Sequence, residues 1–461
     1  MKAKFFKLFA FILVLAMALT LCACGEKTAD DSGANDPGTS SSDNNKPSGG
    51  SAGDTPSGST ADSDKPSGDT AGTTPEPDPV PTEPTLEKNG DGLFMIYTAE
   101  DLVTYRAILE NEMKEFLKND SRFKMGEATS GAILMADIDM SSVCGPDKGN
   151  WRPIGYGVNE EFPDIPGASL VTFDGNGHSI SGLYMKTEET GGGLFVLLQN
   201  AVVTDLTIKS STLDCTYGAG GTSRSNSYGT GTLAMRTDGT TIKNCTVEAD
   251  VTVSGSYTAG GFVGFASEGG NLFERCVNKG TITAHKGAAG GIAGQSSRTT
   301  DVFYCDNYGT INGDNGATAG GILGRATGSS HYDGNIMGCV NYGTIVNVQQ
   351  GPNYIAGIVG DNNSTIYCCI NAGDIQANGG RGYDIASDSD GTFRECINIG
   401  KIYNADNEDK YAYLTDKKGR GVNTTPDDPG LTDGTLIAGD KLDSYYWVQG
   451  EKFPEWNGMM P

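Results

Sequence analysis

A short motif, Cys-x-Asn-x-Gly-x-Ile, recurs along the second half of the chain and constrains its fold more than any other feature. The clearest copies, which end in Gly-Thr-Ile, begin at Cys276, Cys305 and Cys339; weaker copies without that Thr begin at Cys369 and Cys396, and a relative without the Asn begins at Cys245. The steps between successive cysteines are 31, 29, 34, 30 and 27 residues. A regular interval of this length indicates a repeat protein, in which each unit buries its apolar side against its neighbours.

A second motif, two small residues followed by an apolar pair and Gly, lies about half a period from the first. Its copies occupy residues 260–264, 290–294, 320–324 and 356–360. The apolar pieces are short, often β-branched and bounded by Gly, Asn and Asp, which is typical of strands, and none is long enough for a stable helix. Two or three short strands per repeat predict one coil of an all-β, parallel β-solenoid. We therefore expect four glycines to lie above one another in successive coils of one sheet, namely Gly261, Gly291, Gly321 and Gly357.

The alternation of these two motifs resembles the GLUG repeats of bacterial surface proteins, which also occur as a non-catalytic segment in IgA-cleaving metallopeptidases. Residues 136–140, 151–155, 173–183 and 193–195 are similar to the segment that precedes such repeats. The resemblance covers roughly residues 93–403, and it weakens at 384–387, where the glycines are missing, so we expect the stack to end near there. It implies a right-handed parallel β-helix of about eight coils, about 40 Å long at the usual strand spacing.

The ends of a solenoid expose strand edges and core, so both ends need a cover. Residues 98–101 followed by apolar Leu102, Tyr105, Ile108 and Leu109 predict an N-capped helix at the front. Bulky residues at 445–447 and 453–456 predict a plug at the back. The expected organisation is a signal peptide (1–23), a tether (24–88), a capping and lead-in segment (89–172), the β-helix (173–403) and a closing segment (404–461).

The N-terminus has the layout of an export signal, with a basic head at residues 2–7 and an almost wholly apolar run at 8–21. The run ends in Leu21-Cys22-Ala23-Cys24-Gly25, which is similar to the bacterial lipobox. That similarity implies cleavage before Cys24 and attachment of two acyl chains to it, which is enough for stable anchoring on the outer face of the bacterial membrane, in the cell envelope. An ordinary secretory leader and an uncleaved anchor are the alternatives.

Residues 26–88 are mostly Ser, Gly, Thr, Asp, Pro and Ala, a composition that predicts a disordered tether. Flexible-chain scaling puts its ends about 45 Å apart. The formal net charge of the whole chain is -25, which argues against a nucleic-acid partner.

The six cysteines at solenoid spacing suggest either cross-links and metal binding or a packed column. Stacked coils place equivalent side chains about 4.8 Å apart with parallel directions, which suits neither disulfide geometry nor convergence of thiolates on one metal. We therefore predict that Cys245, Cys276, Cys305, Cys339, Cys369 and Cys396 are reduced, buried and inward-facing. The Asn two positions after each Cys is predicted to form a turn ladder, its amide satisfying backbone groups.

Enzymatic chemistry has little support in the sequence, and we predict no catalytic residue, cofactor or metal. The histidines His178, His285 and His331 lie far apart and none belongs to a zinc-protease motif. One enzyme hypothesis remains, because some polysaccharide lyases are parallel β-helices with Ca²⁺-binding carboxylates and a basic residue on one outer face. Its candidate residues are Asp374, Asp384, Asp388 and Asp390 beside Arg381 and Arg394, and the alternative is a solvated acidic surface.

Tyr308 and Tyr342 occupy equivalent positions in successive repeats and form a possible outward strip for stacking on sugars or peptides, or else ordinary turn surface. The sequence thus favours a lipid-anchored, non-catalytic β-helix module at the cell surface, for adhesion, spacing or binding of an extracellular glycan or protein. The alternative is a carbohydrate-active β-helix enzyme of the polysaccharide lyase or hydrolase type.

Overall fold

The computed structural model describes residues 85–119, 125–159, 167–188, 191–216, 229–267, 269–297, 299–327, 334–349, 353–387, 392–403, 421–433, 435–438 and 442–458. The expected signal peptide, Cys24 and nearly all of the expected tether lie outside these residues, as do His331, Asp388 and Asp390.

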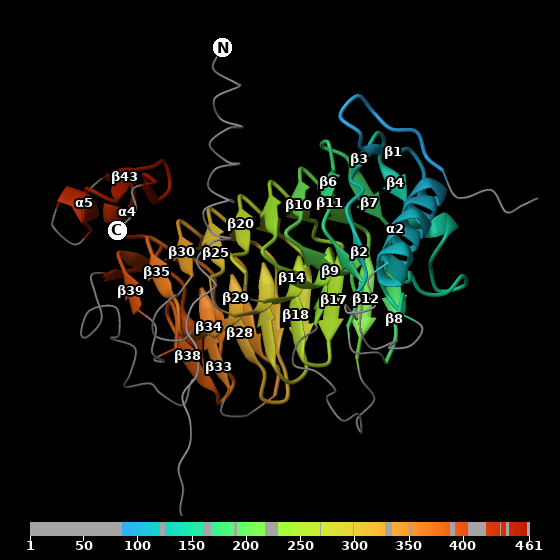
Figure 1. The fold of residues 1–461 in the computed structure, drawn as a ribbon. Coiled ribbons are helices and arrows are strands. Elements are labelled where there is room, and N and C mark those ends of the chain that lie inside the picture. Colours follow the sequence, from blue (N-terminus) through green and yellow to red (C-terminus); the bar gives the residue numbers. More distant parts are fainter. Residues whose placement is uncertain are drawn as a thin grey trace, which may run out of the picture. The chain divides into compact units, whose positions relative to one another are not determined.

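Most of the described chain winds as a parallel β-helix, in which each short strand pairs with its equivalent one turn later (Figure 1). A full turn contributes one strand to each of five sheets, which we number I to V in the order in which the chain visits them. The expected fold is confirmed, with about seven turns and an arrangement consistent with the right-handed form. A turn has five strands rather than the expected two or three, and the turns at the two ends lack one or more of the five.

The strands are distributed over the sheets as follows. Sheet I contains β1 (Phe94–Ile96), β3 (Ala132–Leu134), β6 (Thr172–Asp174), β10 (Val202–Thr204), β15 (Thr241–Lys243), β20 (Leu272–Glu274), β25 (Asp301–Phe303), β30 (Asn335–Met337), β35 (Thr365–Tyr367) and β39 (Thr392–Arg394). Sheet II contains β4 (Ile138–Asp139), β7 (Ser179–Ser181), β11 (Thr207–Lys209), β16 (Thr246–Val247), β21 (Val277–Asn278), β26 (Asp306–Asn307), β31 (Val340–Asn341), β36 (Ile370–Asn371), β40 (Cys396–Asn398) and β42 (Gly421–Asn423). Sheet III contains β8 (Tyr184–Lys186), β12 (Thr212–Cys215), β17 (Thr252–Gly255), β22 (Thr281–Ala284), β27 (Ile311–Gly313), β32 (Ile345–Asn347), β37 (Ile375–Gln376) and β41 (Ile402–Tyr403). Sheet IV contains β13 (Thr230–Gly231), β18 (Thr258–Gly260), β23 (Ala288–Gly290), β28 (Thr318–Gly320), β33 (Tyr354–Ala356) and β38 (Arg381–Tyr383). Sheet V contains β2 (Glu127–Ala128), β5 (Ala168–Ser169), β9 (Phe195–Gln199), β14 (Ala234–Asp238), β19 (Val263–Ala266), β24 (Ala293–Ser297), β29 (Leu323–Thr327) and β34 (Val359–Asn362).

The core is a set of columns, because parallel in-register strands place equivalent side chains above one another. In sheet I the middle residue of most strands points inward and is buried; examples are Phe173, Val203, Ile242, Phe273, Val302, Ile336 and Ile366. Burying such a side chain contributes roughly 2 kcal/mol. The β-branched residues that indicated strands in the sequence therefore also build the core.

The strands are short because the chain turns sharply between sheets I and II. The residue immediately before each Cys of the column has a left-handed backbone, with φ of +54° at Asn244, +53° at Arg275, +54° at Tyr304 and +62° at Gly338. This conformation is ordinary for Gly and Asn but costs about 1 kcal/mol for Arg or Tyr. The neighbouring turns hold it in place, since the N–H of each such residue donates to a backbone carbonyl in the next turn, as Arg275 does to Phe303 at 3.0 Å.

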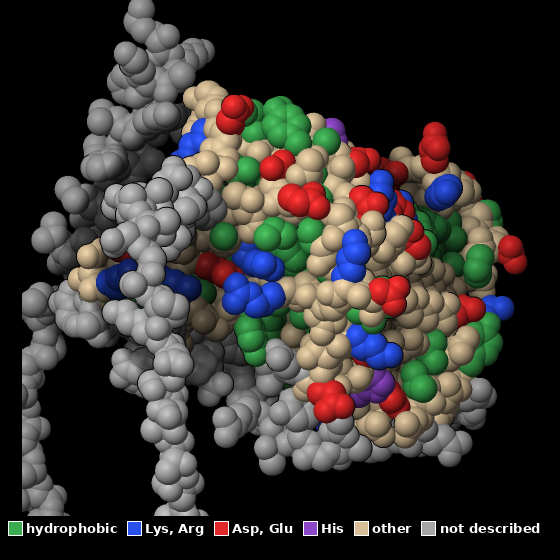
Figure 2. Space-filling view, turned by 90° about the vertical axis from the view of Figure 1, so that its right-hand side faces the viewer, with side chains coloured by type: hydrophobic (Ala, Val, Ile, Leu, Met, Phe, Trp, Pro, Cys, Tyr) green, Lys and Arg blue, Asp and Glu red, His purple; other side chains and the backbone are tan. Residues whose placement is uncertain are grey.

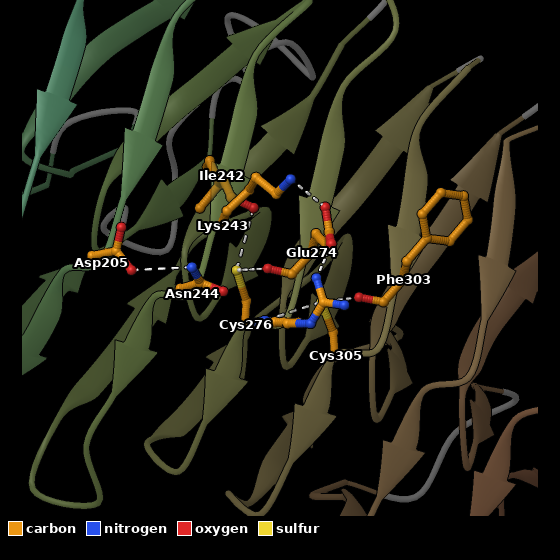
Figure 3. A network of polar contacts seen from close by, with 9 residues as sticks. Asp205, Ile242, Lys243, Asn244, Glu274, Cys276, Phe303 and Cys305 are labelled. Atoms are coloured by element: carbon orange, nitrogen blue, oxygen red, sulfur yellow. Dashed lines mark hydrogen bonds and ion pairs between the residues drawn. The ribbon is translucent and has the colours of Figure 1, made fainter. Parts of the chain in front are cut away.

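The six column cysteines lie directly after this corner, and the prediction made for them is confirmed: all six are buried and none is disulfide-bonded. Each thiol lies close to the carbonyl oxygen two residues earlier, at 3.2 Å for Cys245 and 3.4 Å for Cys305. Figure 3 shows Cys276 between the carbonyls of Ile242 and Glu274, at 3.4 and 3.6 Å. Burial raises the pKa of Cys305 well above its usual range, and that of Cys396 to about 12, so these thiols stay protonated.

The asparagines two positions on form a continuous buried ladder, as predicted. The side-chain amide of Asn307 donates to Asn341 Oδ1 at 2.8 Å and to the carbonyl of Gly309 at 3.0 Å. Its own Oδ1 accepts from the Asn278 amide at 2.7 Å and from the Gly309 N–H at 3.3 Å. Asn307 thus makes four hydrogen bonds, which removes the usual penalty of burying an amide.

The two sequence motifs meet across the core. A Cβ on Gly321 would lie 2.5 Å from the Asn341 side chain, so the second glycine of each Gly-Gly pair leaves room for the amide of the next turn. Gly261, Gly291, Gly321 and Gly357 do stack in successive turns, but they lie at the corner that follows sheet IV rather than inside a sheet. In the last copy Asp384 takes the place of the glycine, and its Oδ1 accepts a hydrogen bond from the last ladder amide, Asn398, at 3.0 Å. Burial raises the pKa of Asp384 to about 7.

The front of the solenoid is covered by α2 (Ala99–Asn119), with the short 3-10 helix η1 (Met140–Ser142) nearby. The predicted cap is present, because Thr98 Oγ1 accepts from the Asp101 N–H at 3.1 Å and Asp101 accepts from the Thr98 N–H at 3.0 Å. The buried face of α2 includes Tyr105, whose ring lies 6.1 Å from that of Phe173 in the core. Seen from this end, charged side chains of both signs and hydrophobic side chains are interspersed over the surface (Figure 2).

The closing segment differs from the expected plug. Its strand β42 extends sheet II, but α4 (Gly430–Asp433), α5 (Thr435–Ala438) and the hairpin β43 (Trp447–Gln449)–β44 (Pro454–Trp456) form a second apolar cluster with the side of the solenoid. The solenoid contributes outward residues of sheet II, including Val340, Ile370, Ile397 and Ile399. These residues are apolar and need a cover along the side, which is why the bulky residues of the segment lie there.

Candidate functional site

The outer face of sheet II changes character along the solenoid, and this change positions the closing segment. In each Cys-x-Asn-x motif the Cys and Asn point inward, so the two x residues point outward. These outward pairs run from Thr246 and Glu248 through Val277 and Lys279, Asp306 and Tyr308, Val340 and Tyr342, and Ile370 and Ala372 to Ile397 and Ile399. The closing segment covers the apolar end of this series. Asp306 and Tyr308 are the outward pair at the boundary between the apolar, covered part of the sheet and the polar part.

The structure brings the two predicted tyrosines together. The rings of Tyr308 and Tyr342 stack with centroids 4.5 Å apart and planes 7° from parallel, and Phe453 of the closing segment lies 6.2 Å from Tyr342. The faces of Tyr342 are thus turned toward Tyr308 and Phe453, whereas Tyr308 is 50% exposed. The pair forms a short ladder along the solenoid rather than a flat platform, and binding of a ligand by these rings stays a prediction.

A cleft of about 430 Å³ lies between the hairpin and the outer face of sheet II. Its floor is built from Asp306, Val340 and Ile370, which are in register on neighbouring strands. The other residues that line it include Tyr304, Tyr342, Glu451, Lys452, Phe453, Glu455 and Trp456. This volume falls within the usual range for small-ligand sites, and aromatic rings with a few charged groups are a typical lining.

Tyr304 and Trp456 form one wall of the cleft. Their rings stack at 4.8 Å, and the Arg275 guanidinium lies 5.2 Å from the Tyr304 ring on the solenoid side. Tyr304 is one of the corner residues with positive φ, so its ring points outward from the start of the column. Gly338, the equivalent corner residue of the next turn, lies under Trp456, where a Cβ would come within 2.5 Å of the indole ring.

Asp306 is the carboxylate on the cleft floor. Burial raises its pKa to about 7. Among the described residues, no side chain donates a hydrogen bond to this carboxylate and no cationic side chain pairs with it. Sequence analysis missed Asp306. The signal that could have found it is its position as the outward residue two places before Tyr308, at the edge of the apolar face.

The acidic cluster of the lyase hypothesis does not assemble from its described members. Asp384 points into the core as the end of the Asn ladder, which corrects its expected outward position. Asp374 accepts from the Lys401 N–H at 3.1 Å, and Arg381 donates to the Tyr354 hydroxyl at 3.0 Å. Arg394 is exposed at the end of sheet I, and Asp388 and Asp390 lie outside the described residues.

One histidine joins a polar relay that the sequence did not reveal. His285 Nε2 lies 3.1 Å from Ser254 Oγ and its Nδ1 lies 2.9 Å from Asp314 Oδ2, the order of contacts found in serine hydrolases. Asp214, however, is the register partner of Ser254 on the same outer face of sheet III, and its negative charge would oppose an oxyanion beside that serine. We therefore interpret the relay as structural: its hydrogen bonds join three successive turns of the solenoid. His178 pairs more loosely with Asp137, at 3.5 Å.

Among the described residues, no three His, Cys, Asp or Glu side chains converge as a metal site would require. No helix in the same ranges is both long enough and apolar enough to span a bilayer.

Comparisons with known proteins add little to this description. No protein-family model matches the chain, and no curated protein matches its sequence. Among solved structures, the chain is similar to a Bacteroides ovatus protein described as a candidate immunoglobulin A1 protease, with 17% identity and a TM-score of 0.46 over 81% of this chain and 94% of that one. A score this low transfers neither fold nor activity, so membership among GLUG-repeat proteins stays a prediction.

Proposed function

We propose that this protein is a lipid-anchored module of the bacterial cell surface, held through Cys24, whose β-helix binds an extracellular glycan or protein. It would be a GLUG-type repeat protein on the strength of its two alternating motifs. The observation that carries the binding role is the cleft on sheet II, since it combines a preformed cavity with aromatic walls on an otherwise regular rod. The export signal and the lipobox support the location.

The anchor is tested by replacing Cys24 with Ala in the full chain, with Cys22→Ala as the matched control. The Cys24→Ala chain is expected to leave the membrane fraction and to lose incorporation of labelled lipid, while Cys22→Ala keeps both. Retention of the label in Cys24→Ala would overturn the anchoring proposal.

The binding role is tested with the soluble Cys24→Ala chain on arrays of glycans and extracellular-matrix proteins. We expect a ligand whose binding is weakened by Tyr308→Ala, because Tyr308 stacks on Tyr342, which lines the cleft. Tyr403→Ala is the control, because Tyr403 is similarly exposed, at 42%, but belongs to β41 of sheet III. Absence of any ligand, or equal effects of the two variants, would count against this role for the cleft.

A further inference from the structure

The charges around the sheet II cleft are unbalanced. Three carboxylates line it, Asp306, Glu451 and Glu455, against the single ammonium of Lys452. Asp306 lies on the floor among apolar and aromatic groups, where solvent screens its charge least. A carboxylate in such surroundings is stabilised in its ionised form by an opposite charge, and among the described residues none is paired with it.

The aromatic groups around the cleft favour the same kind of ligand. Tyr304, Tyr342, Phe453 and Trp456 come from two different parts of the chain and surround the space above Asp306. The negative face of an aromatic ring attracts a cation, most strongly for Trp. Tyr342 lies between Tyr308 and Phe453, and Tyr304 lies between Trp456 and the Arg275 guanidinium, so the attraction for a bound cation comes from Trp456 and Phe453. Val340 and Ile370 add an apolar floor suited to the carbon stem of such a group.

We propose that the cleft binds an organic cation, an alkylammonium or guanidinium group of the kind carried by lysine and arginine side chains, with Asp306 as its counter-charge. This inference rests on the proposed binding function and names the chemistry of its ligand. Asp306 supplies the charge and a hydrogen-bond acceptor, and Trp456, Phe453 and the apolar floor contact the stem.

The pH dependence follows from the raised pKa of Asp306, about 7. Only the ionised carboxylate attracts the cation, so affinity is highest above pH 7 and falls about tenfold for each unit of pH below it. The other titratable groups around Asp306 are Tyr304, Tyr308, Tyr342 and Cys368 from the solenoid and Glu451, Lys452 and Glu455 from the hairpin. The Cys339 thiol lies behind it, in the core.

The test measures binding of Nα-acetyl-lysine amide and Nα-acetyl-arginine amide to the Cys24→Ala full chain by calorimetry between pH 5.5 and 8.5. The neutral control ligand is Nα-acetyl-norleucine amide, which keeps the stem and lacks the charge. We expect binding of the two cations alone, a loss of at least tenfold in Asp306→Asn, and wild-type affinity in the control Asp374→Asn, whose carboxylate lies outside the cleft. Thermal unfolding of Asp306→Asn shows that the variant is folded.

Equal affinity for norleucine amide, undiminished binding in Asp306→Asn, or a neutral oligosaccharide that occupies the cleft would each overturn the cation proposal. If the cations fail to bind but the arrays reveal a ligand sensitive to Tyr308→Ala, this inference is wrong and the proposed function stands. If neither assay finds a ligand, both are wrong.

Discussion

Replacing one amide in the middle of the Asn ladder should destabilise the solenoid far more than its size suggests. In Asn341→Ala, three buried groups lose a partner: the amide of Asn307, which donates at 2.8 Å, the Oδ1 of Asn371, which accepts at 2.8 Å, and the carbonyl of Gly343, which accepts at 3.0 Å. A buried polar group left unpaired costs about 1–3 kcal/mol. Three such groups, relieved in part by water entering the space of the lost amide, predict a loss of about 3–5 kcal/mol.

The matched control is Asn312→Ala on the outer face of sheet III. The amide of Asn312 is half-buried and makes one side-chain hydrogen bond, to Thr283 at 3.1 Å, so its loss should cost less than about 1 kcal/mol. Solenoids unfold turn by turn, and a single unfolding free energy can be ill-defined for them. Hydrogen exchange is therefore the better assay, with faster exchange expected in the turns that contain Asn307 and Asn371 for Asn341→Ala only. Equal effects of the two variants, or unchanged exchange in Asn341→Ala, would refute the ladder as a source of stability.

Three further predictions follow from the described contacts. The pKa of Asp384, about 7, lies above the value in an unfolded chain, so the contribution of its protonated carboxyl to stability is full below pH 4 and is lost as pH rises through 7. Asp384→Asn should flatten this part of the stability profile, measured by urea unfolding from pH 4 to 8. An unchanged profile would contradict the assignment. Cys305→Ala should lower the free energy of unfolding by on the order of 1 kcal/mol, and Cys305→Asp should lower it by several kcal/mol. The nine described cysteines should also resist alkylation in the folded state, as counted by mass spectrometry. Rapid labelling of the column would contradict a buried core. Gly338→Ala should lower the free energy of unfolding by about 2–3 kcal/mol and loosen the hairpin, because the backbone has a φ of +62° and a Cβ would clash with the Trp456 ring. Tryptophan emission and hydrogen exchange at residues 447–456 would report the loosening. Unchanged exchange in the hairpin would show that Trp456 does not pack against Gly338.

Several features of the fold could be predicted because they repeat. A column in a solenoid samples the same environment once per turn, so the recurrence of Cys, Asn and Gly at fixed intervals revealed buried positions without any knowledge of the third dimension. The helical cap was equally accessible, since the reciprocal bonds of Thr98 and Asp101 are local in sequence.

The number of strands per turn could not be predicted in this way. The corner between sheets I and II requires a left-handed residue before each Cys, and the chain places Arg275, Tyr304 and Cys368 there as well as Asn244 and Gly338. Only the last two favour that conformation by themselves. At the others, hydrogen bonds to the adjacent turns impose it, so the sequence shows no consistent turn signal.

The sequence by itself determined the repeat, the inward columns and the need to cover both ends, because each follows from local patterns of polarity and spacing. The tertiary structure alone decided that the closing segment lies along sheet II, that Asp384 ends the Asn ladder, and that Asp306 and Trp456 line one cleft. Each of these depends on contacts between residues that are distant in sequence, such as Tyr304 and Trp456, which stack at 4.8 Å. The energy of such contacts is set by which surfaces meet, and no local pattern records that choice.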